Sequence, residues 1–216
     1  MPRNTALHCV KNAKLTAWSS LEKITERIVL KISRSLICHP SFPEAAVRAI
    51  KVNMEFIPTG DLDLNFELMG NLHQLAIPSP LPPVMTDNLW KHTCFEAFIA
   101  VEGEAEYCEF NFSPSGQWAA YAFKNHREPR PWQISKPLSI KTDRTDDRLL
   151  LSTTILSADL PPNPAKKLFQ MNLTAVIETQ DGRHSYWALH HPSPSPDFHD
   201  RNGFGQQIEA AFGAGF

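Results

Sequence analysis

Apolar and polar residues alternate over much of the chain after residue 42. Every second residue is apolar between 50 and 56, and residues 62–68 repeat this pattern. Alternation with a period of two is typical of a strand with one buried face, because successive side chains point to opposite sides of a sheet. The turn signal at 58–61, which contains proline and glycine, separates the two segments, so we predict a hairpin here.

Further segments of this kind follow, separated by turns rich in glycine, proline, asparagine and aspartate. The segments that we expect to form strands are 47–56, 62–68, 72–77, 90–101, 105–113, 116–123, 136–142, 147–156, 167–178 and 182–190. No helical segments alternate with them, which argues against a repeating β-α-β order. We therefore predict an all-β fold, an antiparallel β-sandwich of about nine to eleven strands.

The N-terminal segment has a different periodicity. Over residues 19–36 apolar residues recur at spacings of three and four, opposite a charged face, and Ser19 with Glu22 forms a capping-box pattern. We predict an amphipathic helix at 19–36 within an N-terminal extension, residues 1–36, followed by the sandwich domain, residues 37–216. Packing of this helix on the domain is favoured over binding to a partner protein, because most amphipathic helices are simply half-buried.

Composition and charge narrow the function classes. The 216 residues are 42% hydrophobic and 20% charged, which is typical of a folded globular chain. With 21 basic and 23 acidic residues and no long run of one sign, the chain lacks the charge pattern of a nucleic-acid-binding protein. Residues 1–20 lack the apolar core of a signal peptide, and no segment has the length of a membrane span, so we expect a cytoplasmic chain that does not bind membranes.

The four cysteines do not form a CxxC pair, which argues against a zinc knuckle or a thioredoxin-type site. Cys94 and Cys108 lie on consecutive predicted strands, but the alternation points them to opposite faces. We therefore expect reduced thiols rather than a disulfide.

Three predicted strands each combine one apolar row of side chains with one mixed row. The mixed rows are Trp90, His92, Cys94, Glu96 and Phe98; Tyr107, Glu109 and Asn111; and Gln170, Asn172 and Thr174. If these strands share a sheet, the rows converge on one face that has aromatic, carboxylate and amide groups but no lysine. Such a face suits a sugar or polyol, because aromatic rings pack on C–H groups and polar side chains bind hydroxyls. A plain solvent-exposed face is the alternative.

Two neighbouring segments carry a distinctive pattern, Leu89–Ala100 (LWKHTCFEAFIA) and Tyr107–Trp118 (YCEFNFSPSGQW). A tryptophan precedes a strand that carries a glutamate, and the next strand ends in Asn-x-x-Pro-x-Gly. This pattern resembles the DOMON-like domains related to family 9 carbohydrate-binding modules. Segments 185–192 and 196–204 are similar to the usual ending of a bacterial branch of these proteins, and the resemblance covers about residues 36–206.

The resemblance implies a β-sandwich whose relatives bind sugars or, in other branches, haem. By motif position, Trp90, Glu96 and Asn111 match residues on the ligand face of sugar-binding relatives, while Asn172 and Trp187 are placed by strand alone. Glu109 departs from the pattern, because sugar-binding relatives often have a basic group there. A second carboxyl group beside Glu96 could instead favour a cation or an amine.

The predicted function is therefore non-catalytic binding of a carbohydrate or similar polar small molecule. The residues expected to bind it are Trp90, Glu96, Glu109, Asn111, Asn172 and Trp187. The alternatives are a structural or protein-interaction domain without a small ligand, and a haem- or metal-binding module. Acid–base catalysis by Glu96 and Glu109, as in a glycosidase, is disfavoured because nothing else in the chain suggests catalysis.

Metal and haem sites have weaker signals, and we expect no cofactor. The weak candidates for metal ligands are His190, His191, Asp197 and His199. Prolines stiffen this segment, which favours a structural role for it. Haem ligation would need a methionine facing a histidine across a pocket, but Met54 and Met171 have the parity of core residues.

Overall fold

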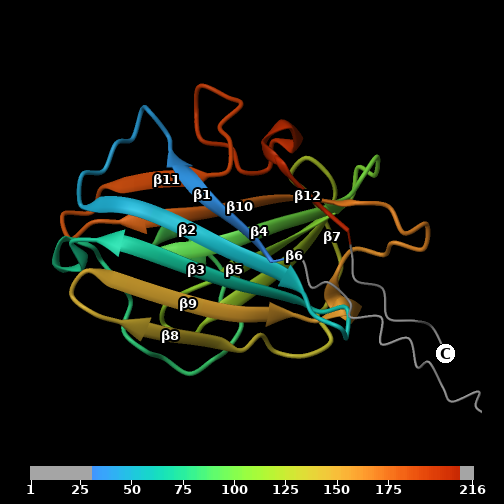
Figure 1. Ribbon diagram of the computed structural model, residues 1–216, viewed down its shortest axis with the longest axis horizontal. Coiled ribbons are helices and arrows are strands. Elements are labelled where there is room, and N and C mark those ends of the chain that lie inside the picture. Colours follow the sequence, from blue (N-terminus) through green and yellow to red (C-terminus); the bar gives the residue numbers. More distant parts are fainter. Residues whose placement is uncertain (1–30, 210–216) are drawn as a thin grey trace, which may run out of the picture.

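The computed structural model describes residues 31–209, which form twelve strands and four short 3-10 helices. The strands are β1 (Ile32–Cys38), β2 (Val47–Phe56), β3 (Leu62–Gly70), β4 (Cys94–Val101), β5 (Tyr107–Phe112), β6 (Trp118–Asn125), β7 (Glu128–Arg130), β8 (Ile140–Arg144), β9 (Arg148–Ile155), β10 (Phe169–Glu178), β11 (His184–Ala188) and β12 (Gln206–Ile208). The 3-10 helices are η1 (Leu72–Gln74), η2 (Leu89–Lys91), η3 (Ser157–Asp159) and η4 (Arg201–Gly203). Figure 1 shows their arrangement. No helix in this range is long and apolar enough to cross a membrane.

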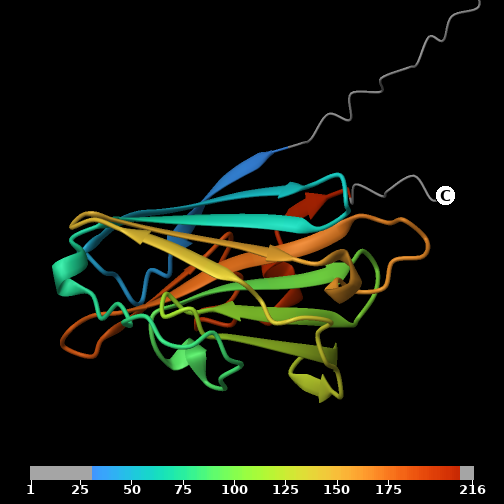
Figure 2. The same cartoon turned by 90° about the horizontal axis from the view of Figure 1, so that it is seen from below.

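All named strand pairs are antiparallel, and hydrogen bonds join the strands in the order β7-β6-β5-β4-β10-β11-β1-β2-β3-β9-β8, with β12 beside β10. β1 connects two layers, because residues 32–36 pair with β2 whereas Ile37 and Cys38 pair with β11. The two layers are seen edge-on in Figure 2. The prediction of an all-β, antiparallel sandwich is therefore confirmed, with twelve strands in residues 31–209 rather than the nine to eleven expected.

The core lies between the two layers and is built from the apolar row of each strand. Phe66 of β3 and Phe95 of β4 are fully buried, and their ring centroids lie 5.1 Å apart across the sandwich. Met54 and Met171 are also fully buried, as their parity predicted. Burial of this apolar surface is the main stabilising contribution to such a fold.

Some local predictions were wrong. Residues 32–36 of the predicted helix 19–36 belong to strand β1, and the earlier part of that helix lies outside the described residues. Segment 72–77 forms η1 and a single bridge at Leu75 instead of a strand. Strand β4 begins at Cys94 rather than at residue 90, because residues 89–91 form η2.

Several turns did follow the sequence. Gly60, Gly103, Gly116 and Gly182 lie between predicted strands or at the first residue of one, and have φ angles between 78° and 92°. Only glycine adopts this left-handed region without a steric cost.

Candidate ligand-binding site

The second layer consists of β7, β6, β5, β4, β10 and β11, with β12 beside β10, and its outer face carries the mixed rows that the sequence predicted. Glu96 of β4 pairs with Asn111 of β5 and with Thr174 of β10, so these three side chains project from the same face of the sheet. Glu109 lies two residues from Asn111 on β5 and pairs with Tyr121 of β6. Cys94 shares this outer face, while Cys108 packs in the interior, as expected.

A cleft of about 520 Å³ opens over this face. Its lining residues come from six strands and from four connecting segments. They are Phe42, Trp90, Glu96, Phe98, Glu109, Tyr121, Phe123, Arg127, Pro129, Val176, Tyr186, Pro196, Phe198 and His199. The volume falls in the range of small-molecule sites, and most of the lining is aromatic.

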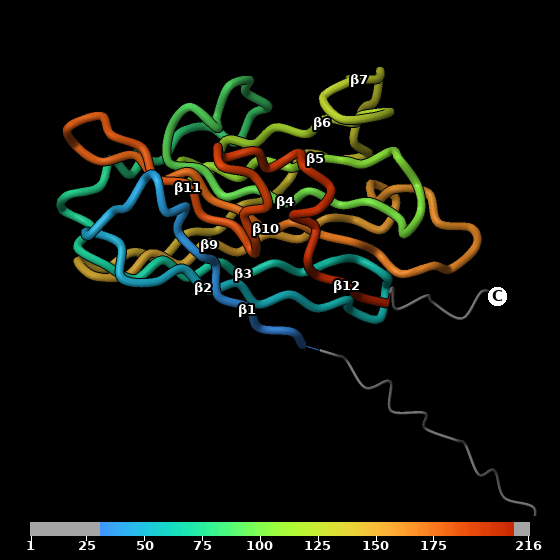
Figure 3. The backbone as a smooth tube through the Cα atoms, turned by 90° about the horizontal axis from the view of Figure 1, so that it is seen from above, coloured from blue at the N-terminus to red at the C-terminus, as the bar shows by residue number. Residues whose placement is uncertain are grey.

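The segment after β11 forms one wall of the cleft. This segment, residues 189–204, runs over the outer face beside β4 and β5 (Figure 3). The Asn172 amide on β10 donates to the Phe198 carbonyl at 3.2 Å, and the Asp197 carboxylate accepts from Arg127 and His126, each at 2.9 Å. These contacts hold the segment 189–204 to both β10 and the turn between β6 and β7.

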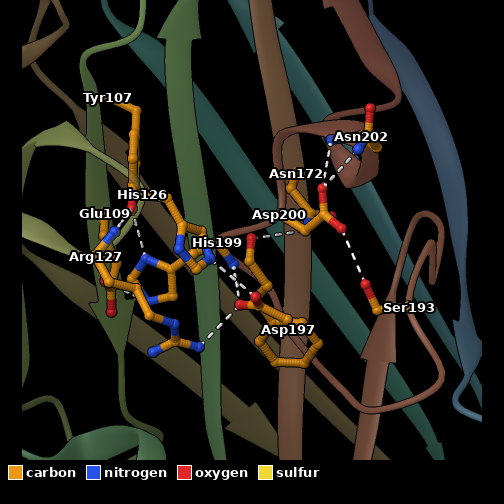
Figure 4. A network of polar contacts seen from close by, with 11 residues as sticks. Tyr107, Glu109, His126, Arg127, Asn172, Ser193, Asp197, His199, Asp200 and Asn202 are labelled. Carbon is orange, nitrogen blue, oxygen red and sulfur yellow. Dashed lines mark hydrogen bonds and ion pairs between the residues drawn. The ribbon is translucent and has the colours of Figure 1, made fainter.

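A chain of hydrogen bonds leads from that turn toward Glu109 (Figure 4). Arg127 has a φ of 54°, and its backbone N–H donates to the Tyr107 hydroxyl at 3.0 Å. That hydroxyl lies 2.8 Å from Nδ1 of His199. Because the hydroxyl already accepts from Arg127, it donates to Nδ1, and the neutral His199 ring then carries its proton on Nε2.

Nε2 of His199 lies 3.6 Å from Oε2 of Glu109, which is too long for a hydrogen bond. Oε1 of Glu109 accepts from the Asn111 amide at 2.7 Å. Burial raises the pKa of Glu109 to about 7, against the opposing effects of Asn111 and Arg127. Burial also lowers the pKa of His199 to about 4, with help from the positive charge of Arg127. The imidazole is therefore neutral at pH 7.

Glu96 is only 2% exposed. Its Oε2 accepts from the Thr174 hydroxyl at 3.1 Å, whereas Oε1 has no hydrogen-bond partner among residues 31–209. Burial, and then the charge of Glu109, raise the pKa of Glu96 well above its ordinary value. The site thus holds two neighbouring carboxyl groups whose ionised forms are disfavoured.

The six residues predicted to bind a ligand have different positions. Trp90, Glu96 and Glu109 line the cleft. Asn111 is fully buried and donates a hydrogen bond to Glu109, and Asn172 contacts the wall segment rather than the cleft. Trp187 does not join them, because β11 pairs it with Ala175, and both side chains face the interior core.

The weak candidates for metal ligands do not converge. Nε2 of His191 contacts the Ile37 carbonyl, and His190 is exposed. Asp197 is paired with Arg127 and with the His126 imidazole. Within residues 31–209 no group of three or more His, Cys, Asp or Glu side chains is arranged to hold a metal ion.

Most of the aromatic residues that line the cleft were not predicted from the sequence as part of the site. Tyr121 was detectable, because the alternation of the segment 116–123 and its pairing with the preceding strand place it beside Glu109. Phe198 had no such signal, and His199 was predicted only as a weak candidate for a metal ligand, because both lie in an irregular segment without periodicity.

The fold and the cleft define an antiparallel β-sandwich with an aromatic-lined outer face. No protein-family model matches this sequence, and a search of the curated proteins found no match. Among solved structures, the chain is similar to a protein of Bacteroides uniformis ATCC 8492 described as a "putative carbohydrate-binding protein". The TM-score is 0.59 at 15% identity, over 81% of this chain and 84% of that one. At this identity the similarity shows the fold.

A second solved structure is a family 9 carbohydrate-binding module from Caldicellulosiruptor kristjanssonii in complex with cellotriose. Its TM-score is 0.39 at 10% identity, over 71% of this chain and 72% of that one, a likeness too low to support an argument. The sandwich expected from the sequence resemblance is thus confirmed as a fold, and the DOMON-like assignment stays a prediction.

Proposed function

We propose that this protein binds a carbohydrate or a similar polar small molecule, without catalysis, in the cleft on the outer face of the second layer. The main support is that Glu96 lines a cleft rich in aromatic side chains and has a buried carboxyl oxygen, Oε1, without a hydrogen-bond partner among the described residues. Aromatic rings pack against the C–H faces of a sugar, and carboxyl groups bind its hydroxyls.

Two further points support the proposal. The similar Bacteroides protein is itself described as a "putative carbohydrate-binding protein". Trp90 lines the cleft yet is 49% exposed, so its ring is available to a ligand and contributes little to the core. A structural domain without a small ligand would have no need of a cleft that combines an exposed tryptophan with a buried carboxyl oxygen without a hydrogen-bond partner.

The test is a thermal-shift screen of the full chain with mono- and oligosaccharides, divalent cations and haem, followed by calorimetry on each ligand that stabilises the protein. We expect a saccharide to raise the melting temperature. The substitution Trp90→Ala should weaken its binding about tenfold, the loss of one aromatic contact, with a smaller effect on folding.

The matched control is Leu81→Ala, which removes an exposed apolar side chain outside the cleft and should leave binding unchanged. Stabilisation by haem or a divalent cation but by no saccharide would contradict the proposal. Unchanged saccharide binding in the Trp90→Ala variant would also contradict the assignment of the cleft.

A further inference from the structure

The lining of the cleft holds two carboxyl groups, Glu96 and Glu109, and a single Lys or Arg side chain, Arg127. Arg127 is the cation among the lining residues, and its guanidinium is already paired with the Asp197 carboxylate at 2.9 Å. His199 is neutral at pH 7, because burial lowers the pKa of its imidazole to about 4. No lining residue forms an ion pair with Glu96 or Glu109 at pH 7, and the charge of Arg127 only partly offsets the burial that raises the pKa of both.

The geometry leaves two carboxyl oxygens available on neighbouring strands. Oε1 of Glu96 is unpartnered in the described part of the chain, and Oε2 of Glu109 lies beyond hydrogen-bonding distance from His199. The remaining oxygens accept from Thr174 and Asn111. Both oxygens belong to side chains that line the cleft, and the two residues are diagonal neighbours on β4 and β5.

The other titratable groups around this pair do not supply a positive charge. Cys94, on the same outer row, has a raised pKa because it is buried, so its thiol is neutral. Tyr107 and Tyr121 have raised pKa values, caused first by burial, and stay neutral as well. The His126 imidazole contacts Asp197 from the turn between β6 and β7 and does not line the cleft.

We propose that the ligand carries a protonated amino group, as an amino sugar does, and that Glu96 and Glu109 bind this group between the aromatic walls. An ammonium group has three N–H donors and no acceptor, which complements carboxylate oxygens. The aromatic face of Tyr121, which lines the cleft, adds a favourable cation–π interaction. This inference rests on the proposed function and names the class of carbohydrate.

A metal ion would fit the same groups poorly. Hard divalent cations take six or more oxygen ligands. The cleft offers two carboxyl groups surrounded mainly by aromatic rings, so an organic cation is the better match.

The test is titration calorimetry of the full chain with D-glucosamine, D-glucose and N-acetyl-D-glucosamine, at pH 5 and at pH 7. At pH 7 we expect glucosamine to bind about tenfold or more tightly than either neutral sugar, the range of a hydrogen bond to a charged group. The preference should shrink at pH 5, because Glu109 is then protonated. The substitutions Glu96→Gln and Glu109→Gln should each reduce it, whereas Glu102→Gln, at an exposed site outside the cleft, should not.

The outcomes are separable. Equal binding of glucose and glucosamine at pH 7 would overturn the amine inference and leave carbohydrate binding in place. Binding of none of the three sugars, together with no saccharide hit in the thermal-shift screen, would overturn the proposed function as well. A glucosamine preference that survives both Gln substitutions would show that these carboxyl groups are not its source, and would also overturn the inference.

Discussion

Replacing Glu109 by glutamine should stabilise the protein at neutral and alkaline pH. Glutamine keeps the shape of the side chain and its oxygen can still accept from Asn111, but it removes the buried charge. The folded-state pKa of Glu109 is raised from 4.5 to about 7, so in the native protein its ionisation becomes unfavourable as the pH rises. A raised pKa stabilises the fold fully below the unfolded value, and this contribution is lost as the pH rises through the folded value.

The gain in unfolding free energy follows from the difference between the unfolded-state and folded-state pKa values of Glu109. A pKa rise from 4.5 to about 7 corresponds to about 3 kcal/mol, at about 1.4 kcal/mol for each pKa unit. The Glu109 side chain is 7% exposed, so solvent screening reduces this little. Relative to the native chain, the Glu109→Gln variant should gain about 3 kcal/mol of unfolding free energy between pH 4.5 and pH 8.

Urea denaturation at several pH values measures this difference directly. The contribution of His199, which is lost as the pH falls from about 6.5 to about 4, is common to both chains and cancels in the comparison. The Glu102→Gln variant is the surface control and should follow the native profile. A stability difference between Glu109→Gln and the native chain that is independent of pH would refute the reasoning, because it would mean that Glu109 ionises in the fold as freely as in water.

Two further substitutions test the framework around the cleft. Tyr107→Phe removes the hydroxyl between Arg127 and His199, leaving two polar groups without that partner, and should cost about 1–3 kcal/mol in urea unfolding and increase hydrogen exchange over residues 189–204. Unchanged exchange there would mean that this hydroxyl does not hold the wall segment. Phe66→Ala opens a cavity against Phe95 and should cost about 3–5 kcal/mol. A loss below about 1 kcal/mol would contradict the packing of the two layers through these rings.

Alternation was a reliable guide wherever a strand had two distinct faces. It placed Glu96, Glu109 and Asn111 on one side of the sheet, and the observed register agrees. The same rule applied to 182–190 would have sent Trp187 inward, because its row, with Ser185 and Leu189, is the opposite of the row that carries Tyr186. The sequence resemblance placed Trp187 by strand alone, without that parity.

The helix predicted at 19–36 shows where periodicity is ambiguous. Ile32 and Leu36 are four residues apart, a spacing that suits one face of a helix and equally one face of a strand. Pairing with β2 decides the outcome for residues 32–36, because a strand here satisfies backbone groups of β2, and residues 37–38 continue the strand beside β11. No local signal contains that information.

The position of the segment 189–204, which forms one wall of the cleft, could not be predicted from the local sequence either. The contact between Asp197 and Arg127 joins residues 70 positions apart, and the contact between Tyr107 and His199 joins residues 92 positions apart. The segment 189–204 has no period that could orient Phe198. Its position depends on a few long-range contacts that only the folded chain brings together.

The cost of the buried carboxyl groups links stability to function. If Glu109→Gln stabilises the protein at pH 8 and also removes the preference for an amino sugar, then the native residue lowers stability at the position where it improves recognition. Groups that destabilise a fold are commonly retained where binding needs them, because the ligand then supplies the missing partner. A bound ammonium group would lower the pKa of Glu109, so ligand binding should release protons near pH 7. Calorimetry in buffers of different ionisation enthalpy would detect that release, and its absence with glucosamine would separate the stability effect from any role of Glu109 in binding.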